Sequence, residues 1–345
     1  MKKSIFMVVA IVMMFALVAC GTKTSTDDEG SKKTYKVALV ADGAGLGSQS
    51  FNDVALEGLE KAKTDFGIEI TTLEVKEAAD LANSLRSLAQ QGMDMIVTPG
   101  AAVQDAVKEV AAEYPNVYFA LLDVQIEGID NVISSAYREH EAAFLLGALA
   151  ASISETNKVG FVGGISGTIQ DRFQYGYMAG ANYVNKDTKV VTSYTGSFSD
   201  VGKGKEIATM MYADGVDFIA PTAGACNLGV FQAASEAGED KWSFGAANGQ
   251  FNQMPEKIVA SQVKRVDNVA YTIVESLVNG TIQGGSKTEY GLVDGGVDLY
   301  YTSEEALLSI IPEEAKTMIE ELRAKIIDGT IDVPANEAEY NAFIQ

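Results

Sequence analysis

Short apolar runs alternate with helical stretches along most of the chain from residue 35 onward. The first run, residues 35–41, is bounded by turn residues and is typical of a strand buried on both faces of a parallel sheet. A loop with three glycines follows, then Ser50, which can cap a helix, and then apolar residues at helical spacing from Val54. Open α/β sheets bind ligands at such turns, where the carboxyl ends of the strands lie.

The same alternation continues to the end of the chain and predicts an α/β fold. Strands are expected at residues 68–75, 93–97, 117–122, 132–136, 158–162, 190–194, 218–220, 242–246 and 258–263, with helices between them and at 139–153, 266–278 and 303–327. Two further short strands are expected within 290–301, about a Gly-Gly turn. The pattern indicates βαβ units arranged as two doubly wound halves.

The first residues are typical of an export signal. Lys2 and Lys3 precede an apolar run of about 14 residues, below the ~20 needed to span a bilayer, and the run ends at Ala19-Cys20. Residues 1–20 are therefore predicted to be a signal peptide whose Cys20 resembles the lipidated cysteine of a bacterial lipobox. An ordinary secreted protein with an incidental cysteine is the alternative. Residues 21–33 are polar and predict a flexible tether.

Charge and cysteine content narrow the class of protein further. The chain has 47 acidic against 26 basic residues and a net charge of −21, which argues against nucleic acid as a partner and against broad adhesion to anionic lipid. If Cys20 is acylated, Cys226 has no cysteine to pair with, so no disulfide framework is expected. About 310 residues remain after the tether, enough for two domains.

The sequence offers little material for catalysis. His140 is the only histidine, so any histidine-dependent triad or metal site needs that residue, and its place at a predicted helix start favours a solvated polar side chain. Neither a zinc-ligand spacing nor a P-loop is present. We predict no catalytic residue, no metal and no cofactor.

The glycine loop at residues 43–47 leaves one enzyme alternative open. It follows a strand and precedes a helix, with Glu69 and Glu74 further on as a possible ribose carboxylate, but Ser48 stands where a dinucleotide fingerprint has its third glycine. A nicotinamide enzyme tethered outside the membrane would also lack its cofactor. A dinucleotide-binding enzyme is therefore the weaker interpretation.

Eight short segments lie in order across nearly all of the mature chain, at residues 42–52, 119–123, 141–151, 158–164, 172–180, 196–205, 223–224 and 261–267. Together they resemble the BMP (basic membrane protein) family, the purine nucleoside receptor-like lipoproteins. The resemblance implies the type I periplasmic-binding-protein fold, with two doubly wound parallel-sheet lobes joined by a hinge. Lobe I is expected at 34–136 plus 265–290 and lobe II at 137–264 plus 291–345.

The resemblance also implies a function and a location. It predicts a substrate-binding lipoprotein of an ABC importer, anchored by lipid on the extracytoplasmic face of the cell membrane, that delivers a nucleoside-like small molecule to a membrane permease. Such a protein makes and breaks no bond. A signalling co-receptor, a surface adhesin with an unused cleft and a tethered hydrolase remain as alternatives of other classes.

Candidate ligand-binding residues follow from the resemblance and from the side chains themselves. The resemblance places Asp42, Phe51 and Asn52 in the first lobe's ligand motif, Asp123 near the hinge, Gly224 at a backbone contact and Lys264 at the sugar; Ser50, Arg172, Phe173 and Asn248 are further candidates. Phe51 beside Asn52 offers a stacking face and an amide, which suits a heteroaromatic base. The alternatives are core packing for the phenylalanines and Arg172, helix caps for the aspartates and a solvated charge for Lys264.

Two departures from the family pattern bear on the ligand. Ser48 replaces an aspartate of the glycine loop, and Ala247 and Gly249 replace both acids of the segment 245–250, where Asn248 is a partial substitute. Losing a carboxylate weakens discrimination for a cis-diol by roughly 1–3 kcal/mol per charged hydrogen bond. The cargo is therefore a nucleoside held differently, a free base, riboflavin or another polar heterocycle. With few acids near it, Lys264 is expected to favour a carbonyl or anionic ligand group, with weak discrimination of ribose from deoxyribose.

Overall fold

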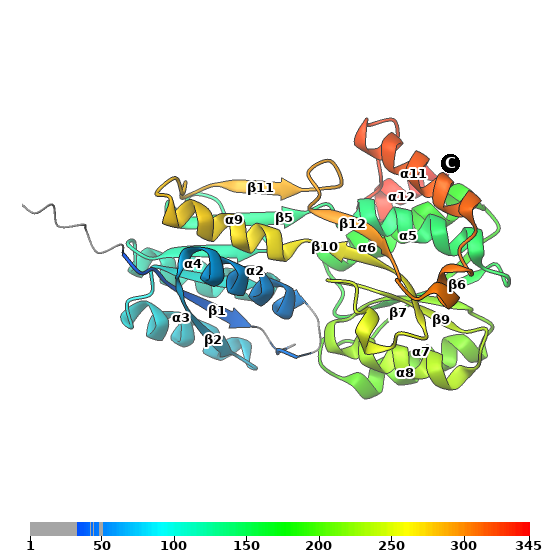
Figure 1. Ribbon diagram of the computed structural model, residues 1–345, viewed down its shortest axis with the longest axis horizontal. Coiled ribbons are helices and arrows are strands. Elements are labelled where there is room, and N and C mark those ends of the chain that lie inside the picture. Colours follow the sequence, from blue (N-terminus) through cyan, green and yellow to red (C-terminus); the bar gives the residue numbers. More distant parts are fainter. Residues whose placement is uncertain (1–32, 42, 44, 48–50) are drawn as a thin grey trace, which may run out of the picture. The chain divides into compact units, whose positions relative to one another are not determined.

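The computed structural model describes residues 33–41, 43, 45–47 and 51–345, and residues 35–345 form one compact unit (Figure 1). The predicted signal peptide, Cys20 and nearly all of the tether lie outside the described residues, as do Asp42, Ser48 and Ser50. None of the described helices is both long enough and apolar enough to cross a membrane.

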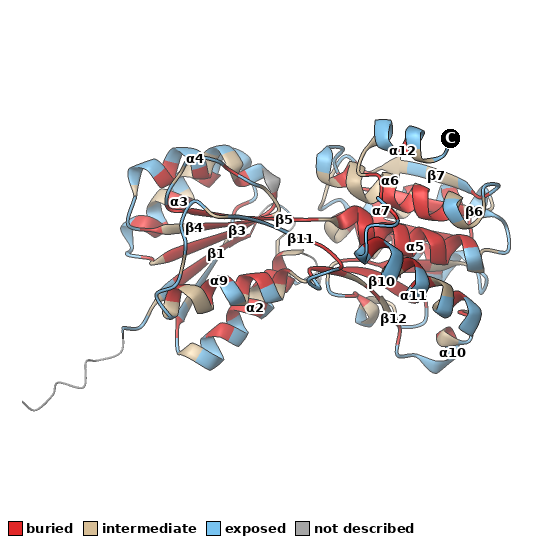
Figure 2. Ribbon diagram, turned by 90° about the horizontal axis from the view of Figure 1, so that it is seen from above, coloured by how far each residue is buried: buried red, intermediate tan, exposed pale blue. Residues whose placement is uncertain are grey.

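The first lobe is built on a six-stranded parallel sheet. Its strands are β1 (Lys36–Ala41), β2 (Glu69–Glu74), β3 (Met95–Pro99), β4 (Tyr118–Leu122), β5 (Val132–Tyr137) and β11 (Lys287–Tyr290), in the order β11-β5-β4-β3-β1-β2. Helices α2 (Phe51–Phe66) and α9 (Val266–Val278) cover one face, and α3 (Leu81–Gln90) and α4 (Gln104–Glu113) cover the other (Figure 2). Short 3₁₀ turns at Ala78–Asp80 and Ala101–Val103 precede α3 and α4.

The second lobe repeats this arrangement with one antiparallel edge. Its strands are β6 (Lys158–Gly163), β7 (Lys189–Tyr194), β8 (Phe218–Thr222), β9 (Trp242–Gly245), β10 (Ile258–Lys264) and β12 (Val297–Tyr301), in the order β12-β10-β9-β8-β6-β7. Only β12 runs antiparallel to its described neighbour, β10. The helices are α5 (Glu139–Ile153), α6 (Thr168–Val184), α7 (Val201–Ala213), α8 (Asn227–Ala237), α10 (Glu305–Leu308), α11 (Glu313–Ile327) and α12 (Glu337–Phe343), with 3₁₀ turns at Gly224–Cys226 and Phe251–Gln253.

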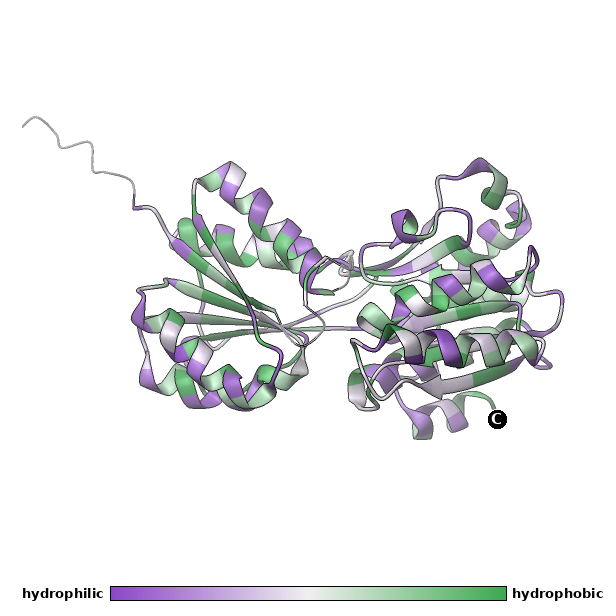
Figure 3. Ribbon diagram, turned by 90° about the horizontal axis from the view of Figure 1, so that it is seen from below, coloured by the Kyte–Doolittle hydropathy of each residue, from purple (hydrophilic) through white to green (hydrophobic). Residues whose placement is uncertain are grey.

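Burial on both sheet faces explains why the strands are nearly continuous apolar runs. In β1, Val37 and Leu39 pack into the core under α2, whereas Ala38 and Val40 pack into the core under α3 and α4. A strand with successive side chains on opposite faces needs apolar residues at every position when both faces are covered. The hydropathy colouring shows the same contrast, with mostly apolar strands and helices that carry polar residues on one side (Figure 3). The prediction of two doubly wound lobes is confirmed.

Glycines let α5 and α6 approach each other closely, which fixes the start of α6 at the edge of the second sheet. A Cβ on Gly147 would lie 2.0 Å from the Tyr177 carbonyl oxygen, and one on Gly180 would lie 1.9 Å from the Phe144 carbonyl oxygen. The same contact buries His140, which is only 6 % exposed. The expectation that His140 is solvated was therefore wrong, because α6 covers the first turn of α5.

Two details of the predicted elements were also wrong. Of the two strands expected within 290–301, only β12 forms: residues 291–296 are a turn, and the strand before it, β11, ends at Tyr290 and pairs with β5, whereas β12 pairs with β10. The helix expected over 303–327 is two helices, α10 and α11, and Pro312 lies at the start of the second, where its missing N–H costs no intrahelical bond. The chain crosses between the sheets at Arg138, at Arg265 and at 291–296. The exact lobe boundaries stay a prediction.

Candidate ligand-binding site

A cavity of about 870 Å³ lies among the carboxyl ends of strands from both sheets. It is lined from the first lobe by the starts of α2 and α3 and the turns after β3 and β4, and from the second by the start of α6, the turn after β7 and the end of β10. Its volume falls within the ~300–1,000 Å³ of ordinary small-molecule sites. The described part of the chain therefore has room for a ligand where doubly wound sheets usually bind one.

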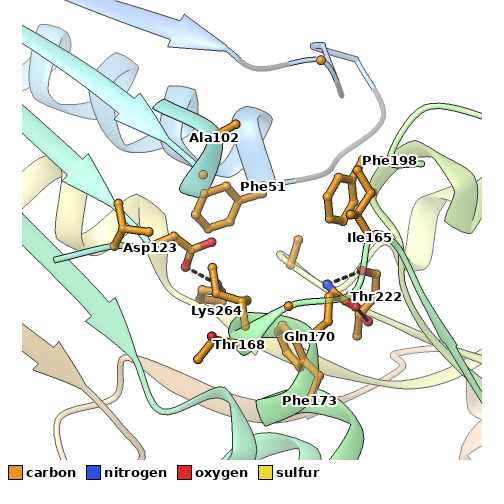
Figure 4. Close-up of a pocket in the computed structure, with 18 of the residues that line it drawn as sticks. Phe51, Ala102, Asp123, Ile165, Thr168, Gln170, Phe173, Phe198, Thr222 and Lys264 are labelled. Atoms are coloured by element: carbon orange, nitrogen blue, oxygen red, sulfur yellow. Dashed lines mark hydrogen bonds and ion pairs between the residues drawn. The ribbon is translucent and has the colours of Figure 1, made fainter. Parts of the chain in front are cut away.

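Three phenyl rings from three separate elements face this cavity (Figure 4). Phe51 is the first residue of α2, Phe173 lies in the first turns of α6, and Phe198 follows β7. Two glycines leave space for Phe198. A Cβ on Gly164 would lie 2.1 Å from the Phe198 ring, and a Cβ on Gly224, at φ +60°, would lie 2.8 Å from the Phe198 carbonyl oxygen. All three rings are only partly buried, which leaves apolar faces for a flat ligand.

Lys264, the last residue of β10, lies in a buried cluster of charges. Its ammonium donates to Asp123 (Figure 4). It also donates to Oε1 of Glu139, over 2.9 Å. Oε2 of Glu139 lies 3.3 Å from Nη1 of Arg172, which also donates to the Tyr137 carbonyl at 2.7 Å. The side chains of Lys264, Asp123 and Glu139 are 7 %, 8 % and 1 % exposed. Two cations thus face two buried anions, and Nη2 of Arg172 also lies 3.8 Å from Oε1 of Glu289, whose side chain is 47 % exposed.

Aromatic rings complete the surroundings of the Lys264 ammonium. The nitrogen lies 4.6 Å from the centre of the Phe51 ring, 4.9 Å from that of Tyr137 and 5.7 Å from that of Phe173. Such contacts favour the charged form of an amine that has lost its water. Burial disfavours the charge, but the fields of Asp123 and Glu139 outweigh burial and raise the pKa of Lys264.

Asp123 is held in an unfavourable state in two respects. Burial, with the repulsion of Glu139, raises the pKa of Asp123 to about 6 against the attraction of Lys264. Its backbone has φ 108°, a region that side chains other than glycine rarely adopt. A hydrogen bond of 2.8 Å from its N–H to the Ser135 carbonyl holds that conformation. Strain and a perturbed carboxyl in a cavity together point to a functional residue.

These contacts correct the expectation about Lys264. A cation with few acidic neighbours was expected, because Ala247 and Gly249 replace two acids. The structure supplies Asp123 and Glu139 instead, from elements about 140 and 125 positions earlier in the chain. Lys264 is neither a solvated charge nor an unpaired one. Because Asp123 and Glu139 already compensate its charge, it does not require an anionic group on the ligand.

The second lobe contributes a wall of neutral polar side chains. Gln170 and Thr222 hydrogen bond to each other at 2.7 Å, and Gln170 also donates to the Thr222 carbonyl at 3.0 Å (Figure 4). Asn227 donates to Gln250 at 3.0 Å and accepts from the Ala223 N–H at 2.8 Å. These bonds connect the turns after β6, β8 and β9, so the wall is held rigid.

The predicted site residues divide into three groups. Phe51, Asp123, Arg172, Phe173, Gly224 and Lys264 line the cavity. Asn52 is buried beside it and donates to the Gly45 carbonyl at 2.9 Å, which fixes the glycine loop, and Asn248 is exposed and donates to Glu57 of α2 outside the lining. Asp42 and Ser50 lie outside the described residues. Ligand contact by any of these residues stays a prediction.

Sequence reasoning missed several residues of the cavity wall. Phe198, Gln170, Gln250 and Gln262 line it, and none was predicted as a site residue. The available signal was position: each follows a strand end or, for Gln262, lies two residues before Lys264 on the same face of one strand.

Among the described residues, no group of three or more His, Cys, Asp or Glu side chains could hold a metal ion. Burial lowers the pKa of His140 to about 4, so its imidazole is neutral at physiological pH.

Two doubly wound lobes that both line one cavity are typical of solute-binding proteins. Comparisons with known proteins place the chain in this class. A solved solute-binding protein of an ABC transporter system from Aeropyrum pernix has a TM-score of 0.82 at 30% identity, over 89% of this chain and 96% of that one. Residues 34–337 match the family described as ABC transporter substrate-binding protein PnrA-like, and the chain belongs to this family.

Relatives of known sequence agree with that assignment. The chain is 35% identical to basic membrane protein A1 of Borrelia garinii over 339 residues, which is 96% of this chain and 98% of that protein. It is 36% identical to basic membrane protein A of Borreliella burgdorferi over 315 residues, which is 90% of this chain and 91% of that protein. The resemblance found in the sequence is confirmed, and the chain is a substrate-binding protein of the ABC-transporter class.

Proposed function

We propose that this protein binds an uncharged nucleoside-like molecule between its lobes and delivers it to the permease of an ABC importer. The observation that carries the proposal is a cavity with three phenyl rings whose buried charges already compensate one another. A flat heterocycle suits the rings. A charged ligand would leave an unbalanced charge in the closed cavity, which is costly.

The same arrangement accounts for how binding would drive transport. Lys264 ends a strand of the second sheet and Asp123 follows a strand of the first, so their ion pair joins the lobes. A ligand that touches both lobes favours the closed form only through its greater affinity for that form. The permease would then bind the closed form of the receptor. No bond of the ligand needs to be made or broken.

Lipid anchoring is the second part of the proposal. The leader ends at Cys20, which follows a small residue and precedes a polar tether. One acylated cysteine with a soluble body would hold the receptor at the extracytoplasmic face, within reach of the permease.

Calorimetric titration of the ligand-stripped protein tests the choice of ligand. The panel consists of inosine, guanosine, adenosine, uridine and cytidine, with the free bases, riboflavin and nucleoside monophosphates as comparisons. We expect binding of at least one ribonucleoside, and binding at least tenfold weaker, about 1.4 kcal/mol, for its monophosphate. Tight binding of free bases or riboflavin alone would replace the nucleoside by another heterocycle. Preference for the monophosphate would contradict the charge argument.

A further inference from the structure

One polar side chain in the cavity wall, that of Gln262, has no hydrogen-bond partner among the described residues. Gln262 is 2 % exposed, and neither its amide nitrogen nor its amide oxygen makes a hydrogen bond with any described residue. The other amides of the same wall, Gln170 and Asn227, are bonded. A buried amide that is left unpaired costs about 1–3 kcal/mol, so such a group is rare in a native protein unless it serves a purpose.

The position of Gln262 connects it to the ligand. It lies in β10 two residues before Lys264, and because side chains alternate along a strand, both lie on the same face. Both residues line the cavity. Val263, between them, lies on the opposite face and is not among the lining residues, and neither is Ser261, which precedes Gln262. Gln262 therefore belongs to the wall of the cavity, and its amide nitrogen and oxygen are themselves almost fully buried there.

The chemistry of the amide defines what it would recognise. A glutamine side chain offers two N–H donors beside one carbonyl acceptor, so it matches a group that presents an acceptor next to a donor. Two parts of a nucleoside have this character: the ring edge, where a carbonyl or ring nitrogen lies beside an N–H, and the pair of sugar hydroxyls. A molecule without such a pair would leave the amide unpaired in the closed cavity.

We propose that Gln262 is a specificity-determining residue that pairs with an adjacent donor and acceptor on the ligand. The inference rests on the proposed function. It adds the group that selects among heterocycles, since the phenyl rings accept any flat ligand. The amide makes no hydrogen bond to a described residue, and a ligand in the cavity would supply its partners.

The test replaces Gln262 by methionine, which has a similar length and no strong donor or acceptor. With the tightest-binding ribonucleoside of the panel, Gln262→Met is expected to weaken binding by about tenfold to a hundredfold, as for two lost neutral hydrogen bonds. The matched control is Ser261→Ala on the other face of the strand, which should bind as the wild type does. Equal affinity of Gln262→Met and wild type would overturn the inference alone. Failure of the wild type to bind any nucleoside would overturn the proposed function.

Two analogues identify the group that Gln262 reads. One is the dideoxy form, which lacks both sugar hydroxyls, and the other carries methyl groups in place of the ring-edge N–H hydrogens. The analogue that lacks the group in contact with the amide should bind wild type and Gln262→Met with equal affinity, because the glutamine then has nothing to pair with. If the methionine variant binds both analogues more weakly than the wild type by the full factor, Gln262 acts indirectly and the inference is wrong.

The melting temperature of the ligand-free protein distinguishes a ligand-binding glutamine from a structural one, because only loss of a structural glutamine would lower it. In protein freed of ligand by unfolding in urea and refolding, Gln262→Met removes an unpaired buried amide, so its melting temperature should equal or exceed that of the wild type. A lower melting temperature would mean that the amide has a structural partner, and would overturn the inference. A variant that binds more weakly and melts no lower supports it.

Discussion

Replacement of Glu139 by glutamine tests the buried charge cluster most sharply. The Glu139 carboxylate is 1 % exposed and accepts from both Lys264 and Arg172. Glutamine keeps the shape and one acceptor oxygen but removes a negative charge, so the buried Lys264 is left with Asp123 alone, whereas Arg172 still lies 3.8 Å from Glu289. Glu139 also opens α5, where a negative charge is favourable to the helix dipole.

The expected loss follows from these contacts. Removing one partner of a buried ion pair costs about 3–5 kcal/mol, because an uncompensated charge remains. Asp123 still faces Lys264, and the new amide oxygen still accepts one bond, so we expect the lower end, about 3 kcal/mol. Urea unfolding of the ligand-free protein, followed by the fluorescence of its single tryptophan, Trp242 in β9, measures this change.

The matched control is a glutamate that bonds to arginine at the surface. Glu113 accepts from Arg86 at 2.8 and 2.7 Å but is 42% exposed, so Glu113→Gln should leave the unfolding midpoint near that of the wild type. If Glu139→Gln unfolds at the same urea concentration as Glu113→Gln, the cluster is not desolvated as described. The argument for an uncharged ligand would then lose its basis.

Three further predictions concern separate parts of the protein. Phe51→Ala should weaken the natural ligand by ~1–3 kcal/mol, the scale of base–aromatic stacking, with folding largely intact; unchanged affinity in calorimetry would move the ring contact elsewhere. Because the pKa of His140 is lowered from 6.5 to about 4, its neutral form contributes stability that is complete above pH 6.5 and is lost as the pH falls towards 4, by about 3 kcal/mol in all. Urea unfolding should therefore show wild type losing more stability than His140→Gln over that range, and parallel pH profiles would refute this. Cys20→Ser should release the protein from the membrane fraction, and unchanged sedimentation with membranes would exclude lipidation at that residue.

Local patterns were sufficient for the strands and for the aromatic turn at Phe51. A strand covered on both faces needs apolar residues throughout, and that requirement is visible in a few consecutive letters. The same letters carry no information about which sheet a short edge strand joins. For this reason two strands were expected as a pair within 290–301, although the strands found there, at 287–290 and 297–301, lie in different sheets.

The electrostatics of the site could not be predicted from local patterns. The partners of Lys264 come from the turn after β4 and from the start of α5, and only the folded chain brings them to the end of β10. The absence of acids at positions 247 and 249 therefore predicted that Lys264 has few acidic partners, and this prediction was wrong. The free amide of Gln262 is likewise visible only when every possible partner nearby has been located.

Native mass spectrometry of the protein purified without unfolding tests the central claim directly. The chain should carry one additional small molecule, and its mass should match an uncharged nucleoside that dissociates when the protein is denatured. A sugar, an amino acid, a peptide or a phosphorylated nucleotide bound in that place would contradict the account.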